Sequence, residues 1–274
     1  MLIRVRHETV YHYEVPAKGV IQRVLLTPRN NPGQHVRRWR IEINHNSRLQ
    51  ESEDAFGNLA HRFYADGPIG TLATLAEGEV ETFDTAGVVR GALERFPPEF
   101  YLRETSLTRP SSGLLDFARG ATAREKSTLA RLHALTAAIY ESMTFDDNAT
   151  HAATAAAEAF GRREGVCQDF AHIFVACARA VEIPARYVSG YFHRSDGVFD
   201  QAAGHAWAEA YIDDLGWVGF DPAHGISPDE CYVRVAAALD YLGAAPVRGA
   251  RMGGLSERME VKVRVAMSHA QMQN

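Results

Sequence analysis

The stretch Gly165-Val166-Cys167-Gln168-Asp169-Phe170-Ala171-His172 places a cysteine at the start of a predicted helix. The apolar residues that continue from it fall at helical spacing: Phe170, Ile173, Phe174, Cys177 and Val181. The free N–H groups and the dipole of a helix N-terminus stabilise a thiolate, so Cys167 is a candidate nucleophile. Gly165 lacks a Cβ, which would let a substrate backbone approach closely. The alternative is that Cys167 is a small buried residue, as most cysteines are.

A predicted β-hairpin downstream supplies a histidine and an aspartate. Residues 205–212 alternate, with His205, Trp207, Glu209 and Tyr211 on one face and small or apolar residues on the other. A turn over 213–216 leads to a second strand over 217–221, and Pro222 keeps the preceding residue extended. Pairing Tyr211 with Trp217 makes Asp221 the diagonal neighbour of His205 on the same face.

Cys167, His205 and Asp221 together offer the nucleophile, the base and the orienting group of a catalytic triad. Each has an ordinary explanation when taken alone, because strand histidines are often structural and an aspartate before proline often forms a turn. The three residues in these local contexts predict cysteine-dependent catalysis. A non-catalytic scaffold that binds a partner in the same cleft is the alternative.

Four sequence blocks resemble the bacterial transglutaminase-like superfamily: 165–171 (GVCQDFA), 183–191 (IPARYVSGY), 205–209 (HAWAE) and 216–222 (GWVGFDP). The resemblance implies an α+β fold, with a papain-like core of helices packed on an antiparallel sheet. It also implies that Cys167 is the nucleophile, His205 the base and Asp221 the orienting residue. Ala223 departs from the family pattern, where a small hydroxyl residue or Asn is frequent, and leaves the triad intact.

The same resemblance implies acyl transfer on a peptide or protein amide through a thioester acyl-enzyme. The acyl group then passes to an amine acceptor (transamidation) or to water (deamidation, or peptide and amide hydrolysis). Relatives are assigned as transglutaminases and as cysteine proteases or amidases, so both outcomes stay open. The backbone N–H of Cys167 is expected to form half of an oxyanion hole.

The first 83 residues predict about five short strands separated by turns, the pattern of a small β-sandwich. This prediction rests on alternation over 1–13 and 36–45, on an apolar run over 20–27 and on the turn 54–58. The span also resembles the N-terminal domain of bacterial transglutaminase-like proteins. We expect an N-terminal β-sandwich domain over 1–90 and a catalytic domain with a C-terminal extension over 91–274. The cluster Arg37, Arg38 and Arg40 alternates with core residues and is interpreted as a solvated strand face.

Within the second domain, periodicity predicts helices over 123–143, 150–160 and 233–242, and strands over 186–193 and 259–265. Residues 243–254 are rich in Gly, Ala and Arg and are expected to be flexible.

Several residues near the predicted triad are candidates for supporting or substrate-binding roles. Gln168, Asp169 and His172 lie within five residues of the cysteine and would tune the thiol, bind substrate or fix the local loop. Tyr191 and Trp207 would form the floor of an acyl-binding pocket or pack in the hydrophobic core. Cys177 lies in an apolar helical stripe and is expected to be an unreactive core thiol.

The composition bears on the partners, the disulfides and the location of the protein. The 274 residues are 46% hydrophobic with a net charge of −5, which gives no reason to expect nucleic acid or an anionic membrane as partner. Three cysteines without paired spacing argue against a disulfide scaffold. We find no signal-like or membrane-spanning run and expect a cytoplasmic protein. No metal-binding motif or phosphate-binding loop is present, so no metal and no cofactor is expected. The oligomeric state stays open.

Overall fold

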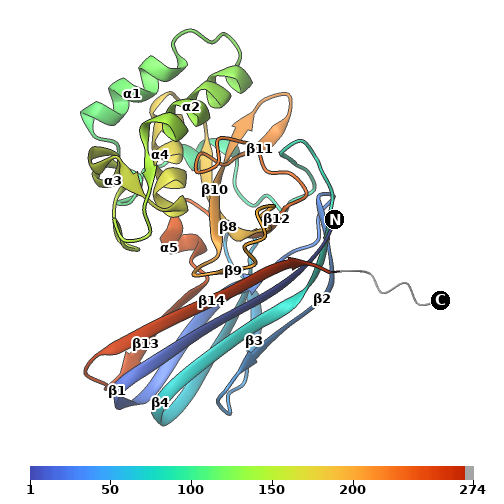
Figure 1. Cartoon of the computed structure of the whole chain (residues 1–274), viewed down its shortest axis with the longest axis vertical. Helices are drawn as coiled ribbons and strands as arrows, with labels where there is room; N and C mark the ends of the chain where they lie inside the picture. The colour runs from blue at the N-terminus through green and yellow to red at the C-terminus, as the bar shows by residue number, and fades with distance from the viewer. Residues whose placement is uncertain (269–274) are drawn as a thin grey trace, which may run out of the picture.

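The computed structural model describes residues 1–268, which form two large β-sheets, a short two-stranded sheet and a group of helices (Figure 1). The helices α1 (Ser112–Thr122), α2 (Thr128–Ser142), α3 (Ala156–Arg162) and α4 (Cys167–Ala180) gather in the upper part of the view. The longest strands lie in the lower part. The expected α+β class is confirmed.

The upper sheet has five strands in the order β12-β8-β10-β11-β5, and all neighbours are antiparallel. The strands are β12 (Tyr232–Ala238), β8 (Ala185–Phe192), β10 (His205–Ile212), β11 (Gly216–Phe220) and β5 (Val88–Val89). Tyr211 pairs with Trp217 between β10 and β11, as predicted. The predicted strand over 186–193 is β8.

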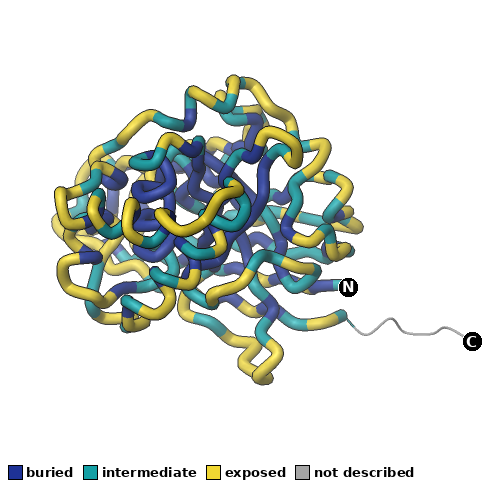
Figure 2. The backbone as a smooth tube through the Cα atoms, turned by 90° about the horizontal axis from the view of Figure 1, so that it is seen from above, coloured by how far each residue is buried: buried dark blue, intermediate teal, exposed yellow. Residues whose placement is uncertain are grey.

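Helix α4 lies at the centre of the upper part. Ile173 and Phe174 of α4 share a buried cluster with Ala208 and Ala210 of β10. The small alanines let the helix approach the sheet closely, which explains the strict alternation of β10. Figure 2 shows the deeply buried backbone enclosed by exposed loops and helix surfaces.

The lower sheet has seven strands and folds back on itself as a β-sandwich. Its two long strands, β1 (Leu2–Thr27) and β4 (Leu59–Thr82), pair along most of their lengths, with register shifts between His12 and Gly19 and between Val24 and Thr27. We define the first layer as β2 (Gln34–Ile43), β4 over 71–82, β1 over 2–13, β14 (Glu257–Met267) and β9 (Asp200–Gln201). The second layer is β3 (Gln50–Glu53), β4 over 59–69, β1 over 17–27 and β13 (Val247–Met252).

Both layers contribute to one hydrophobic cluster. Tyr13 and Leu72 of the first layer pack in it with Val20 and Phe63 of the second. The sheet is thus continuous in hydrogen bonding but two-layered in packing, as in a β-sandwich.

The C-terminal extension differs from the expectation that groups it with the catalytic domain. β13, within the segment expected to be flexible, pairs with β1 from Val24–Val247 to Gly19–Met252, and β14 pairs with β1 from Ile3 to Tyr13. Without these partners the 26-residue strand β1 would present a long unpaired edge. The lower sheet is therefore built from both ends of the chain. The predicted final strand over 259–265 is confirmed as part of β14.

The helix predicted over 233–242 is wrong. This segment contains most of β12 and then the short helix α5 (Tyr241–Ala244), whose N-cap Asp240 accepts a hydrogen bond from the Gly243 N–H at 3.1 Å. The alanines at 236–238 suit either state, and pairing with β8 decides for the strand.

The other two predicted helices are present, but each begins several residues later than predicted. α2 begins at Thr128 with Ser127 as its N-cap, and α3 begins at Ala156. Shorter elements complete the chain: the 3-10 helix η1 (Pro98–Leu102) and the parallel pair β6 (Thr144–Phe145) and β7 (Glu164–Gly165).

Acidic partners neutralise the arginines on the outer face of the first layer. Arg6 and Arg40 flank Glu77 across three adjacent strands, with N–O distances of 2.7 and 2.9 Å to its carboxylate. Arg4 and Arg38 flank Glu79 in the same way. The cluster Arg37, Arg38 and Arg40 is thus part of a solvated, ion-paired strand face. No described helix has the length and apolarity to cross a membrane.

Candidate active site

Cys167 is the first residue of α4 and is partly exposed. Asp169 caps this helix, because its Oδ2 accepts the Val166 N–H at 2.9 Å and the Thr150 hydroxyl at 2.6 Å. A Cβ on Gly165 would lie 2.7 Å from the same Oδ2. Gly165 therefore makes room for the capping carboxylate, and its close approach to a substrate backbone stays a prediction.

His205 and Asp221 are joined by a buried hydrogen bond. His205 is the first residue of β10, and Asp221 directly follows β11. The His205 Nε2 lies 2.7 Å from Asp221 Oδ2, and the carboxylate is fully buried. With Nε2 directed at Asp221, Nδ1 is the ring nitrogen left to face a reacting group.

The surroundings of His205 favour its protonated form. Burial alone would lower the pKa of His205, but the Asp221 carboxylate and the Cys167 thiol raise it to about 10. Burial likewise acts to raise the pKa of Asp221, and the neighbouring His205 and His224 instead hold it below its ordinary value. A positively charged imidazolium therefore lies beside the cysteine.

Two further side chains donate to Asp221. His224 Nδ1 donates to Oδ2 at 2.8 Å, and the Tyr232 hydroxyl donates to it at 2.7 Å. The sequence analysis identified neither residue as part of the site. The position of His224, three residues after Asp221, could have indicated it. Tyr232 directly precedes the segment that was wrongly predicted to be helical.

The departure from the family pattern at Ala223 acts through the backbone. Its N–H donates to Asp221 Oδ1 at 3.0 Å, a contact that does not depend on the side chain.

Within residues 1–268, one cluster has side chains of the types that bind metals close together: His205, Asp221 and His224. Their potential ligand atoms all lie within 4.8 Å of one another. Asp221 Oδ2, however, already accepts hydrogen bonds from His205, His224 and Tyr232. The geometry is that of a hydrogen-bonded carboxylate, and we propose no metal here.

The other candidate residues mostly support the fold. His172 is buried and neutral: burial lowers its pKa to about 3, and its Nε2 accepts the Tyr241 N–H at 3.0 Å. The buried Tyr191 hydroxyl lies 3.0 Å from His7 Nδ1 on the lower sheet. Trp207 is buried against Tyr232, and Gln168 donates to the Ala152 carbonyl at 3.3 Å.

Cys177 is buried, and burial raises the pKa of its thiol, as expected for an unreactive core cysteine.

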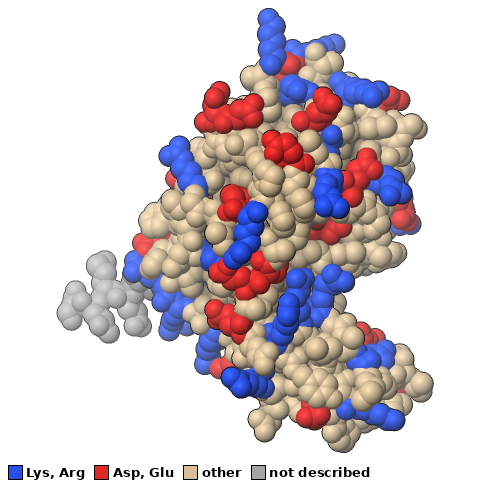
Figure 3. All heavy atoms as spheres, turned by 180° about the vertical axis from the view of Figure 1, so that it is seen from behind, with Lys and Arg blue, Asp and Glu red and all other residues tan. Residues whose placement is uncertain are grey.

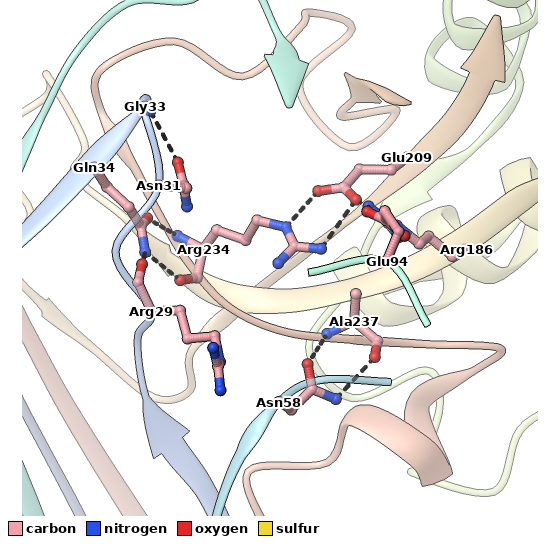
Figure 4. Close-up of polar contacts among 10 residues, drawn as sticks. All are labelled: Arg29, Asn31, Gly33, Gln34, Asn58, Glu94, Arg186, Glu209, Arg234 and Ala237. Carbon is pink, nitrogen blue, oxygen red and sulfur yellow. Dashed lines mark hydrogen bonds and ion pairs between the residues drawn. The ribbon is translucent and has the colours of Figure 1, made fainter. Parts of the chain in front are cut away.

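A second buried carboxylate, Glu209, lies four residues along β10 from His205. Arg186 Nε donates to it at 2.6 Å and Arg234 Nε at 2.7 Å, and Arg186 also binds Glu94 through two nitrogens (Figure 4). Burial would raise the pKa of Glu209, but Arg234 and Arg186 lower it to about 2. This cluster is a permanently charged network.

The free edge of β12 is held by two side-chain amides. Gln34 donates to the Arg234 carbonyl and accepts the Arg234 N–H, both at 2.8 Å. Asn58 does the same with Ala237, both at 2.9 Å (Figure 4). An amide offers one donor and one acceptor side by side, so each acts like a residue of a neighbouring strand. These contacts tie the N-terminal region to the strand that carries Tyr232.

Two family models match the chain. Residues 115–222 match the transglutaminase-like superfamily, and residues 3–81 match the bacterial transglutaminase-like N-terminal region. The first match contains Cys167, His205 and Asp221, and the second covers most of the N-terminal part of the lower sheet.

Individual relatives agree with these matches. An uncharacterised protein of Mycobacterium leprae is 28% identical over 277 residues, covering 96% of this chain and 98% of that protein. A protein-glutamine gamma-glutamyltransferase of Pseudomonas aeruginosa is 31% identical over 109 residues, which are 35% of this chain and 16% of that protein. The crystal structure of a "putative cysteine protease" from Cytophaga hutchinsonii superposes with a TM-score of 0.78 at 22% identity, covering 98% and 92% of the two chains.

Proposed function

Because the chain belongs to the transglutaminase-like superfamily, we propose that it catalyses cysteine-dependent acyl transfer on amide substrates with Cys167, His205 and Asp221 as its triad. One observation carries the proposal: the buried His205–Asp221 hydrogen bond of 2.7 Å, in a site where the Cys167 thiol raises the pKa of the same imidazole. A binding scaffold would need neither the charged imidazole nor a thiol at a helix N-terminus.

The chemistry follows from the positions of the protons. The Cys167 thiolate attacks the amide carbonyl, and its backbone N–H donates to the developing oxyanion. His205 gives a proton to the departing amine or ammonia, so a C–N bond breaks as the thioester forms. His205 then takes a proton from the incoming amine or water, which attacks the thioester and releases the thiolate. Asp221 keeps the imidazole oriented through Nε2 during both steps.

The substrate class is a peptide or protein amide, with a primary amine as one acceptor. Similarity to a protein-glutamine gamma-glutamyltransferase favours the glutamine side chain as the amide. The residues present supply every proton-transfer role, so the proposal invokes no cofactor. We place the protein in the cytoplasm on the grounds of its composition.

Mass spectrometry of a glutamine-containing peptide, with and without a primary amine, tests this function. A mass gain equal to the amine minus ammonia shows transfer, conversion of the amide to the acid shows deamidation, and fragments show peptidase activity. Cys167→Ala should abolish every product. Cys231→Ser is the matched control, because burial and the nearby Asp229 raise the pKa of Cys231 to about 11. Products that persist in Cys167→Ala would refute the assignment.

A further inference from the structure

Three arginines form a row across the outer face of the second layer. Arg23 of β1 pairs directly with Arg62 of β4 on one side and with Arg248 of β13 on the other. Their side chains lie on one face, opposite to Val24 and Phe63, which pack inside the sandwich. We call Arg62, Arg23 and Arg248 the arginine row.

The arginine row lacks the acidic neighbours that the first layer has. In the first layer, Glu77 and Glu79 on β4 each lie between an arginine of β1 and an arginine of β2. Within residues 1–268, neither Arg62 nor Arg248 forms an ion pair, and Arg23 approaches one carboxylate, Asp54, at 3.7 Å. Like charges directly opposite each other destabilise a sheet, so this row carries a cost that an anionic ligand would relieve.

Local structure uses part of the row's hydrogen-bonding capacity. Arg23 Nη2 donates to the Gly243 carbonyl at 3.1 Å, and Arg248 Nη1 donates to the Leu242 carbonyl at 2.7 Å, both in α5. Each guanidinium has five N–H donors, so several remain. Arg62 is exposed and makes no side-chain hydrogen bond within the described residues.

Exposed apolar side chains continue the same face away from the core. Ile21 and its partner Tyr64 are 53% and 50% exposed, and Met252, in the next row, is 59% exposed. In the other direction, Leu25 is buried at the junction with the upper part of the molecule. Figure 3 shows basic side chains beside the hollow between the lower part and the part above it.

The arginine row is linked to the candidate active site through α5. Arg248 binds the Leu242 carbonyl, and the N–H of the neighbouring Tyr241 donates to His172, on the helix that begins with Cys167. The Tyr241 ring packs edge-on to Tyr187 at 6.2 Å. Contacts through α5 therefore connect the arginine row to the helix that begins with Cys167.

We propose that the arginine row, with Ile21, Tyr64 and Met252, binds an acidic segment of the peptide substrate whose amide reaches Cys167. This inference rests on the proposed function. Arginine guanidinium groups bind carboxylates in paired, directional hydrogen bonds, and exposed apolar patches mark interaction surfaces. A peptide fits better than a nucleic acid, because the net charge of −5 opposes a long polyanion and exposed apolar side chains adjoin the arginine row.

Fluorescence anisotropy tests binding without turnover. The full chain with Cys167→Ala is titrated against a labelled peptide with one glutamine followed by four glutamates, and against the same peptide with serines in place of the glutamates. The test pair is Arg62→Gln with Arg248→Gln. The matched control pair, Arg38→Gln with Arg40→Gln, removes the same charge from the first layer.

We expect the acidic peptide to bind more tightly than the serine peptide. The test pair should weaken its binding about tenfold, and the control pair less than about twofold. Equal losses in both pairs, no preference for the acidic peptide, or tighter binding of an oligonucleotide of the same charge would each overturn the proposal.

Turnover of the serine peptide by the unmodified protein separates the two hypotheses. If the serine peptide reacts and the acidic peptide neither binds more tightly nor reacts faster, the proposed role of the arginine row is refuted and the proposed catalysis is supported. If the acidic peptide binds the arginine row and neither peptide reacts, the proposed catalysis fails instead.

Discussion

Glu209 on β10 and Asp221, directly after the neighbouring strand β11, are both fully buried carboxylates, but their partners differ in kind. Glu209 is bound by Arg186 and Arg234, which stay charged at any pH the protein survives. Asp221 is bound by His205, His224 and Tyr232, whose protons can move.

The difference separates a structural charge from a reactive one. A carboxylate held by arginines stays ionised above about pH 5 and stabilises one arrangement of strands. A carboxylate held by an imidazole can stabilise that ring before and after it transfers a proton. Burial and hydrogen-bond number are similar in the two clusters, so the nature of the donors distinguishes them.

Asp221→Asn should have the largest effect, on rate. The amide can present an N–H to His205 and favour the wrong tautomer, so we expect kcat to fall roughly 10²- to 10⁴-fold in the peptide assay. Because Asp221 is fully buried, the melting temperature should fall as well, and the rate is therefore measured on protein shown to be folded. Asp213→Asn and Asp214→Asn, in the turn before β11, are controls expected near the wild-type rate. A wild-type rate for Asp221→Asn would show that another residue orients His205.

Glu209→Gln should lower the stability of the fold and leave the rate nearly unchanged. Removing one charge from a buried network costs about 3–5 kcal/mol, so the free energy of unfolding in urea should fall by that order. The protein that stays folded should keep a rate close to wild type, because Glu209 does not contact His205 or Asp221. A folded variant with a loss of rate as large as that of Asp221→Asn would break the comparison.

The two clusters should respond to pH in opposite directions. The pKa of Glu209 is lowered from 4.5 to about 2, so its contribution is complete above about pH 5 and is lost as the pH falls toward 2. The pKa of His205 is raised from 6.5 to about 10, so its contribution is complete below 6.5 and is lost as the pH rises toward 10.

Unfolding measured across this range should show the stabilities of wild type and Glu209→Gln converging in acid. The stabilities of wild type and His205→Gln should converge in alkali. The same trend for both variants would contradict the distinction between the clusters.

Tyr232→Phe should have the smallest effect. It removes one neutral donor from the Asp221 carboxylate, a loss of about 1.5 kcal/mol, or about tenfold in kcat/KM if the donor acts on the reactive pair. Tyr191→Phe is the matched control, because its buried hydroxyl contacts His7 and not Asp221. Equal rates for the two variants would remove Tyr232 from the site.

Local patterns predicted the parts of the site that lie close together in the chain. Helical spacing after Cys167 and the alternation of 205–212 were sufficient for the helix start and for the β10–β11 register. Both depend on contacts within a few residues or across one tight turn. The pairing of Asp221 with His205 followed from that register.

Long-range pairing decided what the sequence did not reveal. The alanines of β12 have no period of their own, and their strand state depends on β8 and on the amides of Gln34 and Asn58. Tyr232 was missed for this reason. β13 was missed because its partner in β1 lies more than 220 residues earlier in the chain.

The pairing of β1 with β13 and β14 has a consequence for biosynthesis. During translation β1 emerges more than 220 residues before its partners β13 and β14. The edge of β1 that faces away from β4 therefore stays unpaired until β13 and β14 have been made, and the nascent chain presents an open strand edge until then. A chain that stops before residue 247 would leave β1 without either strand, so completion of the lower sheet depends on a segment made long after its central strand.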